Sequence, residues 1–180
     1  MAANQPPWPR AWLMTDERLG GRLWQAVDAL PEAAGIVFRH YSLADDDRLE
    51  LGTRLAERAR KRGLLLAVAG SERLAEQLGA QLVHNPVGDP GLLPFSRSAH
   101  SLEEAAAACS SGASLIFLSP IHATRSHPGR KPLPRDTARR IVADCPVPVI
   151  ALGGMNRERF DQLRSDGFYG WAGIDAWLEK

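Results

Sequence analysis

The feature that most constrains the fold of this 180-residue chain is a series of eight short apolar runs separated by polar, mostly helix-like connections. Most runs lack strict alternation, which is typical of parallel strands that are covered on both faces. Strands that alternate with helices favour a parallel sheet. The predicted strands are Ala11–Thr15, Gly35–Arg39, Leu64–Ala69, Gln81–His84, Leu93–Ser96, Leu115–Ser119, Val147–Leu152 and Tyr169–Gly173.

Signals for helix ends lie between these runs. Ser101 and Glu104 form a capping box at the start of an alanine-rich stretch, in which the serine accepts a hydrogen bond from an unpaired backbone amide. Asn156 is a predicted cap for the stretch to Asp166. Four glycines stand where a helix would end and the next run begins, as a left-handed cap requires. They are Gly63, Gly79, Gly112 and Gly167.

Eight such units predict one domain over residues 1–180, an α/β fold of the (β/α)8 TIM-barrel class. Such barrels usually exceed about 200 residues, so this one must be compact. The connection Asn85–Leu92 is too short and too rich in Pro and Gly for a helix, so the helix after the fourth strand is missing. The last helix is truncated to Asp175–Lys180. A doubly wound open sheet is the alternative, although no G-x-G-x-x-G follows the first run.

Composition excludes several classes of protein. The 22 basic and 21 acidic side chains leave a net charge of +1, so a general nucleic-acid or acidic-membrane binder is not expected. The longest apolar run has six residues, far below the roughly 20 of a membrane span. The chain begins without a basic head and an apolar stretch, and Cys109 and Cys145 lack C-x-x-C spacing. We therefore expect a cytoplasmic protein with reduced thiols.

In a barrel of this class the active site lies at the carboxyl ends of the strands. Four of the five histidines fall at or just beyond such ends, namely His40, His84, His100 and His122, and His127 follows in a loop. An imidazole titrates near neutral pH and can give or take a proton there. The competing interpretation is that several of them are solvated loop residues or cap backbone carbonyls.

Two further segments indicate an anion site. The 17-residue loop Ser119–Arg135 carries Arg125, Arg130, Lys131 and Arg135 and no acidic residue, a charge that would attract a phosphate ester. A merely solvated basic loop is the alternative. Gly153 and Gly154 directly follow the seventh run, where barrels of this class often bind phosphate through backbone amides. No zinc-ligand spacing and no G-x-S-x-G motif is found.

Together these residues resemble the thiamine-phosphate synthase and thiazole tautomerase superfamily over nearly the whole chain. The matching pieces occur in family order. They are WLMTD (Trp12–Asp16), Arg39, LAEQLGAQLVH (Leu74–His84), SRSAHSLEEA (Ser96–Ala105), FLSPIHATRSHPG (Phe117–Gly129) and PVPVIALGGM (Pro146–Met155). The resemblance implies the (β/α)8 barrel and a role in thiamine biosynthesis.

The synthases of this family join a pyrimidine pyrophosphate to a thiazole phosphate with the help of Mg²⁺. Their Gln-x-Arg-x-Lys motif keeps only Arg39 in this chain, and their metal-binding Asn-Asp pair falls on Ala69 and Gly70. The second magnesium aspartate matches Asp89. A serine of the phosphate loop after the last strand falls on Asp175, whose carboxylate would repel a phosphate.

The resemblance therefore implies His100 as the acid/base group and Asp89 as the one matching Mg²⁺ ligand. The implied ligands are a thiazole phosphate and a pyrimidine phosphate. The residues implied in binding them are Arg39, Ser98, Thr124, Arg125, Ser126, His127, Lys131, Gly153 and Gly154.

Three functions follow. The first is a thiamine-phosphate synthase that couples these two substrates. The second is a thiazole tautomerase that moves a proton through His100, because that branch also lacks the metal aspartate. The third is a non-catalytic binder of thiamine precursors. We also expect a homodimer, or a rearranged N-terminal segment, to cover apolar surface that the truncated last helix leaves on the first and seventh helices.

Overall fold

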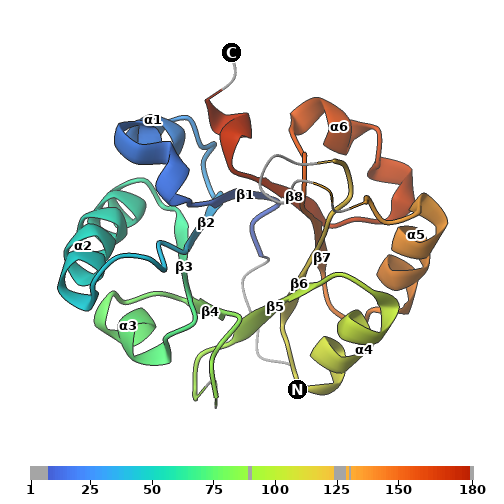
Figure 1. Cartoon of the computed structure of the whole chain (residues 1–180), viewed down its shortest axis with the longest axis horizontal. Coiled ribbons are helices and arrows are strands. Elements are labelled where there is room, and N and C mark those ends of the chain that lie inside the picture. The colour runs from blue at the N-terminus through green and yellow to red at the C-terminus, as the bar shows by residue number, and fades with distance from the viewer. Residues whose placement is uncertain (1–7, 89–90, 124–128, 130, 179–180) are drawn as a thin grey trace.

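The computed structural model describes residues 8–88, 91–123, 129 and 131–178. Its eight strands form a closed barrel in chain order, with every neighbouring pair parallel and β1 paired to β8 (Figure 1). The predicted barrel is confirmed, and the open sheet is wrong. The strands are β1 Ala11–Met14, β2 Gly35–Phe38, β3 Leu65–Ala69, β4 Leu82–His84, β5 Phe95–Ala99, β6 Leu115–Leu118, β7 Val149–Ala151 and β8 Gly170–Gly173.

Helices surround the barrel, with α1 to α3 on one side and α4 to α6 on the other (Figure 1). The described parts of the connection from β4 to β5 contain no helix, and only a short 3-10 turn follows β8. Both shortened units are therefore as predicted. The helices are η1 Glu17–Arg22, α1 Leu23–Asp28, α2 Asp45–Lys61, α3 Glu72–Gln77, α4 Leu102–Ser110, α5 Arg135–Asp144, α6 Arg157–Asp161, η2 Arg164–Asp166 and η3 Asp175–Trp177. None of the helices in the described part of the chain has the length and apolar character that a membrane span requires.

The predicted helix caps are present. The side chain of Ser101 accepts a hydrogen bond from the amide of Glu104 at 3.2 Å, and the Glu104 carboxylate accepts one from the amide of His100 at 2.7 Å. Asn156 caps α6 at 2.9 Å, but that helix ends at Asp161, earlier than the sequence indicates.

The fifth strand is a correction. The sequence indicates Leu93–Ser96, whereas β5 runs from Phe95 to Ala99. The second half of β5 is not an apolar run, because Ser96 and Ser98 point into the barrel while Phe95 and Ala99 face the helices. Buried hydroxyls are tolerated where they find hydrogen-bond partners, and both serines have such partners on β4 or just after it.

Two apolar layers hold the fold together. The outer layer lies between the strands and the helices. The inner layer fills the barrel itself, and its largest member is Trp12, whose ring meets Phe117 edge-on with centroids 5.4 Å apart. The inner residues are Trp12, Met14, Val37, Ala67, Ala69, Leu82, Leu115, Phe117, Ile150 and Ala172.

The turn η3 closes the gap left by the missing last helix. The Trp177 ring stacks on Trp171 with centroids 4.6 Å apart, and its indole N–H donates to the backbone carbonyl of Trp12 at 3.2 Å. The large apolar side chains that are exposed in the described chain are Tyr41, Val87 and Leu92, none of which lies on α1 or α6. The uncovered surface expected on those two helices is therefore wrong for the described residues.

Cys109 and Cys145 are free thiols, as predicted, but the fold brings them together. Their sulfur atoms lie 3.6 Å apart, at the end of α4 and just after α5. Burial and the hydrogen bond to Cys109 raise the pKa of Cys145 to about 12. Because the thiolate is the reactive form, this thiol is chemically quiet at neutral pH.

The packing of Trp12 against Gly35 yields a stability prediction. A Cβ atom on Gly35 would lie 2.3 Å from the Trp12 ring, which has no free space to retreat into. Gly35→Ala should lower the free energy of unfolding by about 3 kcal/mol, as overpacking of a core does. Urea unfolding measures this change.

The matched control is Gly21→Ala. A Cβ atom there would meet nothing within 4 Å, so its effect should stay within about 0.5 kcal/mol. Equal stabilities of the two variants would contradict the packing described for Trp12.

Candidate active site

Side-chain contacts link neighbouring strand ends around much of the barrel mouth. Closure of a parallel barrel brings all the carboxyl ends to one face, and the polar residues there bond across from strand to strand. The side chain of Arg39, just after β2, reaches the residue that follows β1. His84 and Asn85 reach β5 from the end of β4. His100, just after β5, reaches the residue that follows β6. The sequence prediction that these ends meet is therefore consistent with the fold.

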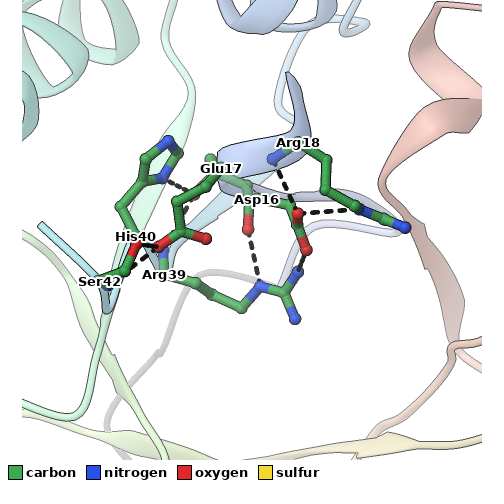
Figure 2. Close-up of polar contacts among 7 residues, drawn as sticks. Asp16, Glu17, Arg18, Arg39, His40 and Ser42 are labelled. Atoms are coloured by element: carbon green, nitrogen blue, oxygen red, sulfur yellow. Dashed lines mark hydrogen bonds and ion pairs between the residues drawn. The ribbon is translucent and has the colours of Figure 1, made fainter. Parts of the chain in front are cut away.

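Arg39 is a cation at this mouth whose side chain is anchored by two hydrogen bonds (Figure 2). Its Nε donates to the Thr15 carbonyl at 2.7 Å and its Nη2 to Asp16 at 2.9 Å. The backbone amide of Arg39 also donates to the Thr15 hydroxyl at 2.9 Å. Burial lowers the pKa of the guanidinium, and the charge of Asp16 opposes that shift. The side chain is thus held in one orientation by groups at the end of β1.

Asp16 itself holds two arginines and a helix end. One carboxylate oxygen accepts from the Arg18 backbone amide at 3.0 Å and from Arg18 Nε at 2.9 Å, while the other accepts from Arg39. Beside it Glu17 accepts from the amide and the hydroxyl of Ser42 (Figure 2). The carboxylates of Asp16 and Glu17 therefore hold together the loops that follow β1 and β2.

His40 is a buried structural residue. Its Nδ1 lies 3.0 Å from the Thr15 hydroxyl, and its ring stacks on Phe38 with centroids 5.3 Å apart. Burial lowers its pKa, so that the imidazole is neutral at pH 7. The competing interpretation of the histidines as solvated loop residues is therefore wrong for His40.

The end of β3 provides no metal ligand. Gly70 follows the strand with a φ of 83°, and the adjacent Ala69 carbonyl accepts from Arg48 Nη2 at 2.8 Å. Arg48 also donates to the Arg39 carbonyl at 3.1 Å and lies over the rings of Phe38 and Tyr41. Within residues 8–88, 91–123, 129 and 131–178 no three His, Cys, Asp or Glu side chains are grouped so that they could hold a metal ion. The described donors thus do not fit a resident Mg²⁺ site, and Asp89 lies outside the described residues.

Between β4 and β5 the contacts are dense. His84 is 2% exposed, with its Nδ1 at 2.9 Å from Ser96 Oγ and its ring edge-on to Phe117. Burial and the nearby charge of Arg39 lower the pKa of His84 to about 3. Asn85 bonds the backbone and the hydroxyl of Ser98. Ser98, predicted as a ligand-binding residue, therefore lies inside the barrel mouth with its position set by β4.

His100 has a defined tautomer. Its Nδ1 lies 2.9 Å from the carbonyl oxygen of Ser119 and 3.1 Å from the hydroxyl of the same residue. A carbonyl can only accept, so Nδ1 carries the hydrogen and Nε2 keeps the lone pair in the neutral ring. This arrangement suits a group that accepts a proton at Nε2.

The loops after β6 and β7 lie against each other. The amide of His122 donates to the Gly153 carbonyl at 3.0 Å. A Cβ atom on Gly153 would lie 2.8 Å from Pro120 Cα, and one on Gly154 would lie 2.4 Å from the Ala123 carbonyl. Both glycines also have positive φ values. The glycine pair is thus required by the close approach of these loops.

Much of the predicted basic loop is outside the described residues. Thr124, Arg125, Ser126, His127 and Arg130 fall there, whereas Lys131 is described and exposed. The prediction that Arg135 belongs to this basic loop needs correction. Arg135 begins α5, and its Nε donates to the buried Asp166 at 2.6 Å. It therefore serves the outer helices and not the anion site. Asp175, which was expected to oppose phosphate, opens η3 just after β8.

Known proteins match this chain over most of its length. The family model of thiamine monophosphate synthase matches residues 93–177. A putative thiamine-phosphate synthase 2 of Aquifex aeolicus is 31% identical over 185 residues, which cover 95% of this chain and 98% of that protein. The chain belongs to the thiamine-phosphate synthase family. The resemblance stated from the sequence is thereby confirmed, and with it the assignment to transferases of thiamine biosynthesis.

Other relatives agree. A thiamine-phosphate synthase of Methylococcus capsulatus is 29% identical, with 94% of this chain and 83% of that protein covered. Among solved structures, a thiamine phosphate pyrophosphorylase from Pyrococcus furiosus superposes with a TM-score of 0.80 at 25% identity, covering 93% of this chain and 86% of that one. These relatives span the barrel from end to end.

Sequence reasoning missed two residues that organise this mouth. Asn85 directly follows β4, where the sequence indicates no more than the start of a loop. Arg48 lies in the first half of α2, where nothing in the sequence points toward the mouth. Asp16 is predicted from the sequence as the polar end of the first strand, but only the fold shows that it holds Arg39.

The low pKa of His84 yields a pH prediction. The unfolded chain binds a proton at His84 near pH 6.5, whereas the folded chain binds one only near pH 3. Below pH 6.5 the unfolded state therefore holds more protons, so stability falls as the pH falls toward 3. Between pH 6 and 4.5 the slope for wild type should exceed that of His84→Gln by about 1 kcal/mol per pH unit.

Urea unfolding of both proteins across this pH range measures the two slopes. The carboxylates contribute equally to the pH dependence of both proteins, so the difference between the two slopes is due to His84. Parallel curves would show that His84 takes up its proton in the folded state without cost.

Proposed function

We propose that this chain is a thiamine-phosphate synthase that binds a thiazole phosphate and joins it to a pyrimidine pyrophosphate. In this reaction the thiazole nitrogen attacks the pyrimidine methylene carbon and the pyrophosphate leaves. The observation that carries the proposal is the anchored guanidinium of Arg39 at the mouth of a barrel whose relatives are named synthases. The same names do not favour the tautomerase and the non-catalytic binder.

Arg39 is proposed to hold the leaving pyrophosphate. Its Nε donates to the Thr15 carbonyl and one Nη2 hydrogen to Asp16. The remaining N–H groups of the guanidinium can therefore donate to an anion at a fixed place. Lys131 and the basic residues Arg125 and Arg130 are proposed to add charge from the loop after β6. Thr124, Ser126 and His127 are proposed to bind the same anion.

The remaining ligand contacts are assigned to the other strand ends. Ser98 would donate to the anion, and the amides near Gly153 and Gly154 would bind the thiazole phosphate, as close-approach glycines allow. His100 would exchange a proton at Nε2 with the leaving group or the thiazole. A Mg²⁺ ion bound to Asp89 would have to be brought largely by the pyrophosphate, since a single carboxylate is a poor site for this ion.

The Arg39 assignment is tested by the coupling reaction and by binding. With both substrates and Mg²⁺ supplied, purified protein should form thiamine phosphate, and Arg39→Gln should lower kcat/KM by about a hundredfold, as loss of a charge-assisted contact predicts. Chromatography measures the product and calorimetry measures pyrophosphate binding.

Arg58→Gln is the matched control. Arg58 pairs with Asp28 on the outside of the barrel, with both side chains nearly half exposed. The kcat/KM of Arg58→Gln should equal that of wild type. The proposal would be refuted if wild type at millimolar substrate neither formed thiamine phosphate nor bound pyrophosphate.

His100→Ala separates the remaining alternatives. In a synthase it should lower kcat by about tenfold to a thousandfold, the range of general acid–base catalysis, while binding of thiazole phosphate stays near that of wild type. If the coupling reaction is absent but thiazole isomerisation occurs and is lost in His100→Ala, the protein is a tautomerase. Binding without any turnover identifies the non-catalytic binder.

We also propose a homodimer. Its support is no longer the gap beside η3 but the side chains of Val87 and Leu92, which are 86% and 100% exposed. We propose that these two side chains belong to one surface that a second copy covers, because contiguous exposed apolar surface marks interaction sites. Light scattering should give twice the chain mass for wild type and a lower mass for Val87→Ser/Leu92→Ser. A monomeric wild type would refute the dimer.

A further inference from the structure

The contacts between β4 and β5 form a closed set of four side chains at the mouth. Ser98 Oγ lies 3.1 Å from Asn85 Nδ2 and 3.3 Å from His84 Nε2. Asn85 Nδ2 also lies 3.2 Å from His84 Nε2, and His84 Nδ1 lies 2.9 Å from Ser96 Oγ. The amide of Ser98 donates to Asn85 Oδ1 at 2.8 Å. The direction of the hydrogen bonds follows from which of these groups can only donate or only accept.

Asn85 determines the tautomer of His84. Because the Asn85 oxygen accepts from the Ser98 amide, its nitrogen end faces the imidazole and Ser98 Oγ. The NH₂ group donates only, so His84 Nε2 must be the acceptor and Nδ1–H donates to Ser96. The ring is buried beside Arg39 and Arg97, whose charges disfavour a second proton on it. His84 therefore offers one lone pair, and Asn85 occupies it.

The hydroxyl hydrogen of Ser98 is then left for another acceptor. Ser98 Oγ accepts from Asn85, and the NH₂ group of Asn85, which can only donate, already bonds the imidazole lone pair. Ser98 points to the inside of the barrel, as Ser96 does, because the alternate residues Phe95 and Ala99 pack toward the helices. Ser98 is only partly buried at the mouth, so this hydrogen can reach a ligand that enters there.

The backbone supports a dedicated role for Asn85. Its φ of 48° lies in the left-handed region, which few residues other than glycine occupy without cost. Asparagine tolerates this region better than most residues. The amide of Asn85 donates to the Ser96 carbonyl at 2.8 Å, so the turn is tied to β5 by its backbone as well.

We propose that Asn85 is a positioning residue, which occupies the acceptor of His84 and so directs the hydroxyl hydrogen of Ser98 to an anionic oxygen of the ligand in the mouth. The inference rests on the proposed function, because it deepens the role of Ser98 in binding pyrophosphate or a phosphate ester. Without Asn85 the Ser98 hydroxyl would turn to His84 Nε2 and present its lone pairs to the anion.

A double-mutant cycle on binding tests this. Asn85→Gly removes the side chain but accepts the left-handed backbone. By calorimetry with inorganic pyrophosphate and with thiazole phosphate, Ser98→Ala should bind at least one of them about tenfold more weakly, and Asn85→Gly about fivefold. The double variant should bind that ligand no more weakly than Ser98→Ala, because Asn85 acts only through the Ser98 hydroxyl.

Ala33→Gly is the matched control for backbone freedom. Ala33 also has a positive φ of 55°, and it precedes β2 at the opposite end of the strand. Its affinity for both ligands should equal that of wild type. Thermal unfolding of all variants shows whether they remain folded at the temperature of the titration.

Nitrogen NMR of the His84 ring tests whether the Ser98 hydroxyl turns to Nε2 when the Asn85 side chain is absent. In wild type and in Asn85→Gly, Nε2 should remain hydrogen-bonded, first to Asn85 and then to Ser98. In the double variant both donors are gone, so the Nε2 resonance should move to the position of a free imidazole nitrogen.

The outcomes separate the two levels of the proposal. Wild type that binds neither ligand at millimolar concentration overturns the proposed function and this inference together. Wild type that binds, with Asn85→Gly as tight as wild type, overturns this inference alone. The role of Asn85 is likewise refuted if the loss from Asn85→Gly is as large in the Ser98→Ala background as in wild type, or if Ser98→Ala weakens neither ligand.

Discussion

The indole of Trp12 inside the barrel is the contact on which the rest of the structure depends. The strands have only three to five residues, so one large ring fills much of the space that they enclose. Gly35 on the next strand makes room for it, Phe117 meets its edge, and its backbone carbonyl receives the Trp177 indole that closes the gap after β8. A solid interior below leaves only the strand ends free for polar groups.

Those polar groups are arranged so that positive charge is fixed and the histidines are specialised. Arg39 is held by the carbonyl of Thr15 and the carboxylate of Asp16. His40 and His84 are buried, and their lowered pKa values keep them neutral. His100 instead bonds a carbonyl through Nδ1, which leaves the lone pair of the neutral ring on Nε2. This division suits binding of a pyrophosphate or phosphate by anchored donors, with one imidazole left to move a proton.

The sequence predicted the barrel well because its signals are local. Short apolar runs and capping residues report directly on strands and helix ends. The shortened fourth and eighth units followed from the short lengths of these segments and from the Pro and Gly content of the fourth. The predicted fifth strand starts two residues and ends three residues too early, since Ser96 is polar but buried and Ser98 is polar and partly buried. Whether a hydroxyl can be buried depends on partners from β4 that only the folded barrel supplies. The prediction of uncovered apolar surface beside the last turn is wrong for a similar reason. The stacking of Trp177 on Trp171 depends on the folded barrel and not on the local sequence.

By itself the sequence therefore determined the order of strands and helices, the end of the barrel that holds the site, and the family, since these depend on periodicity and on motifs read along the chain. The tertiary structure alone decided which polar residues act together. Asp16 with Arg39, Asn85 with Ser98 and Cys109 with Cys145 are each separated by more than ten residues and meet only when the barrel closes. Hydrogen-bond direction and pKa depend on distance and burial, and neither exists until distant segments have packed.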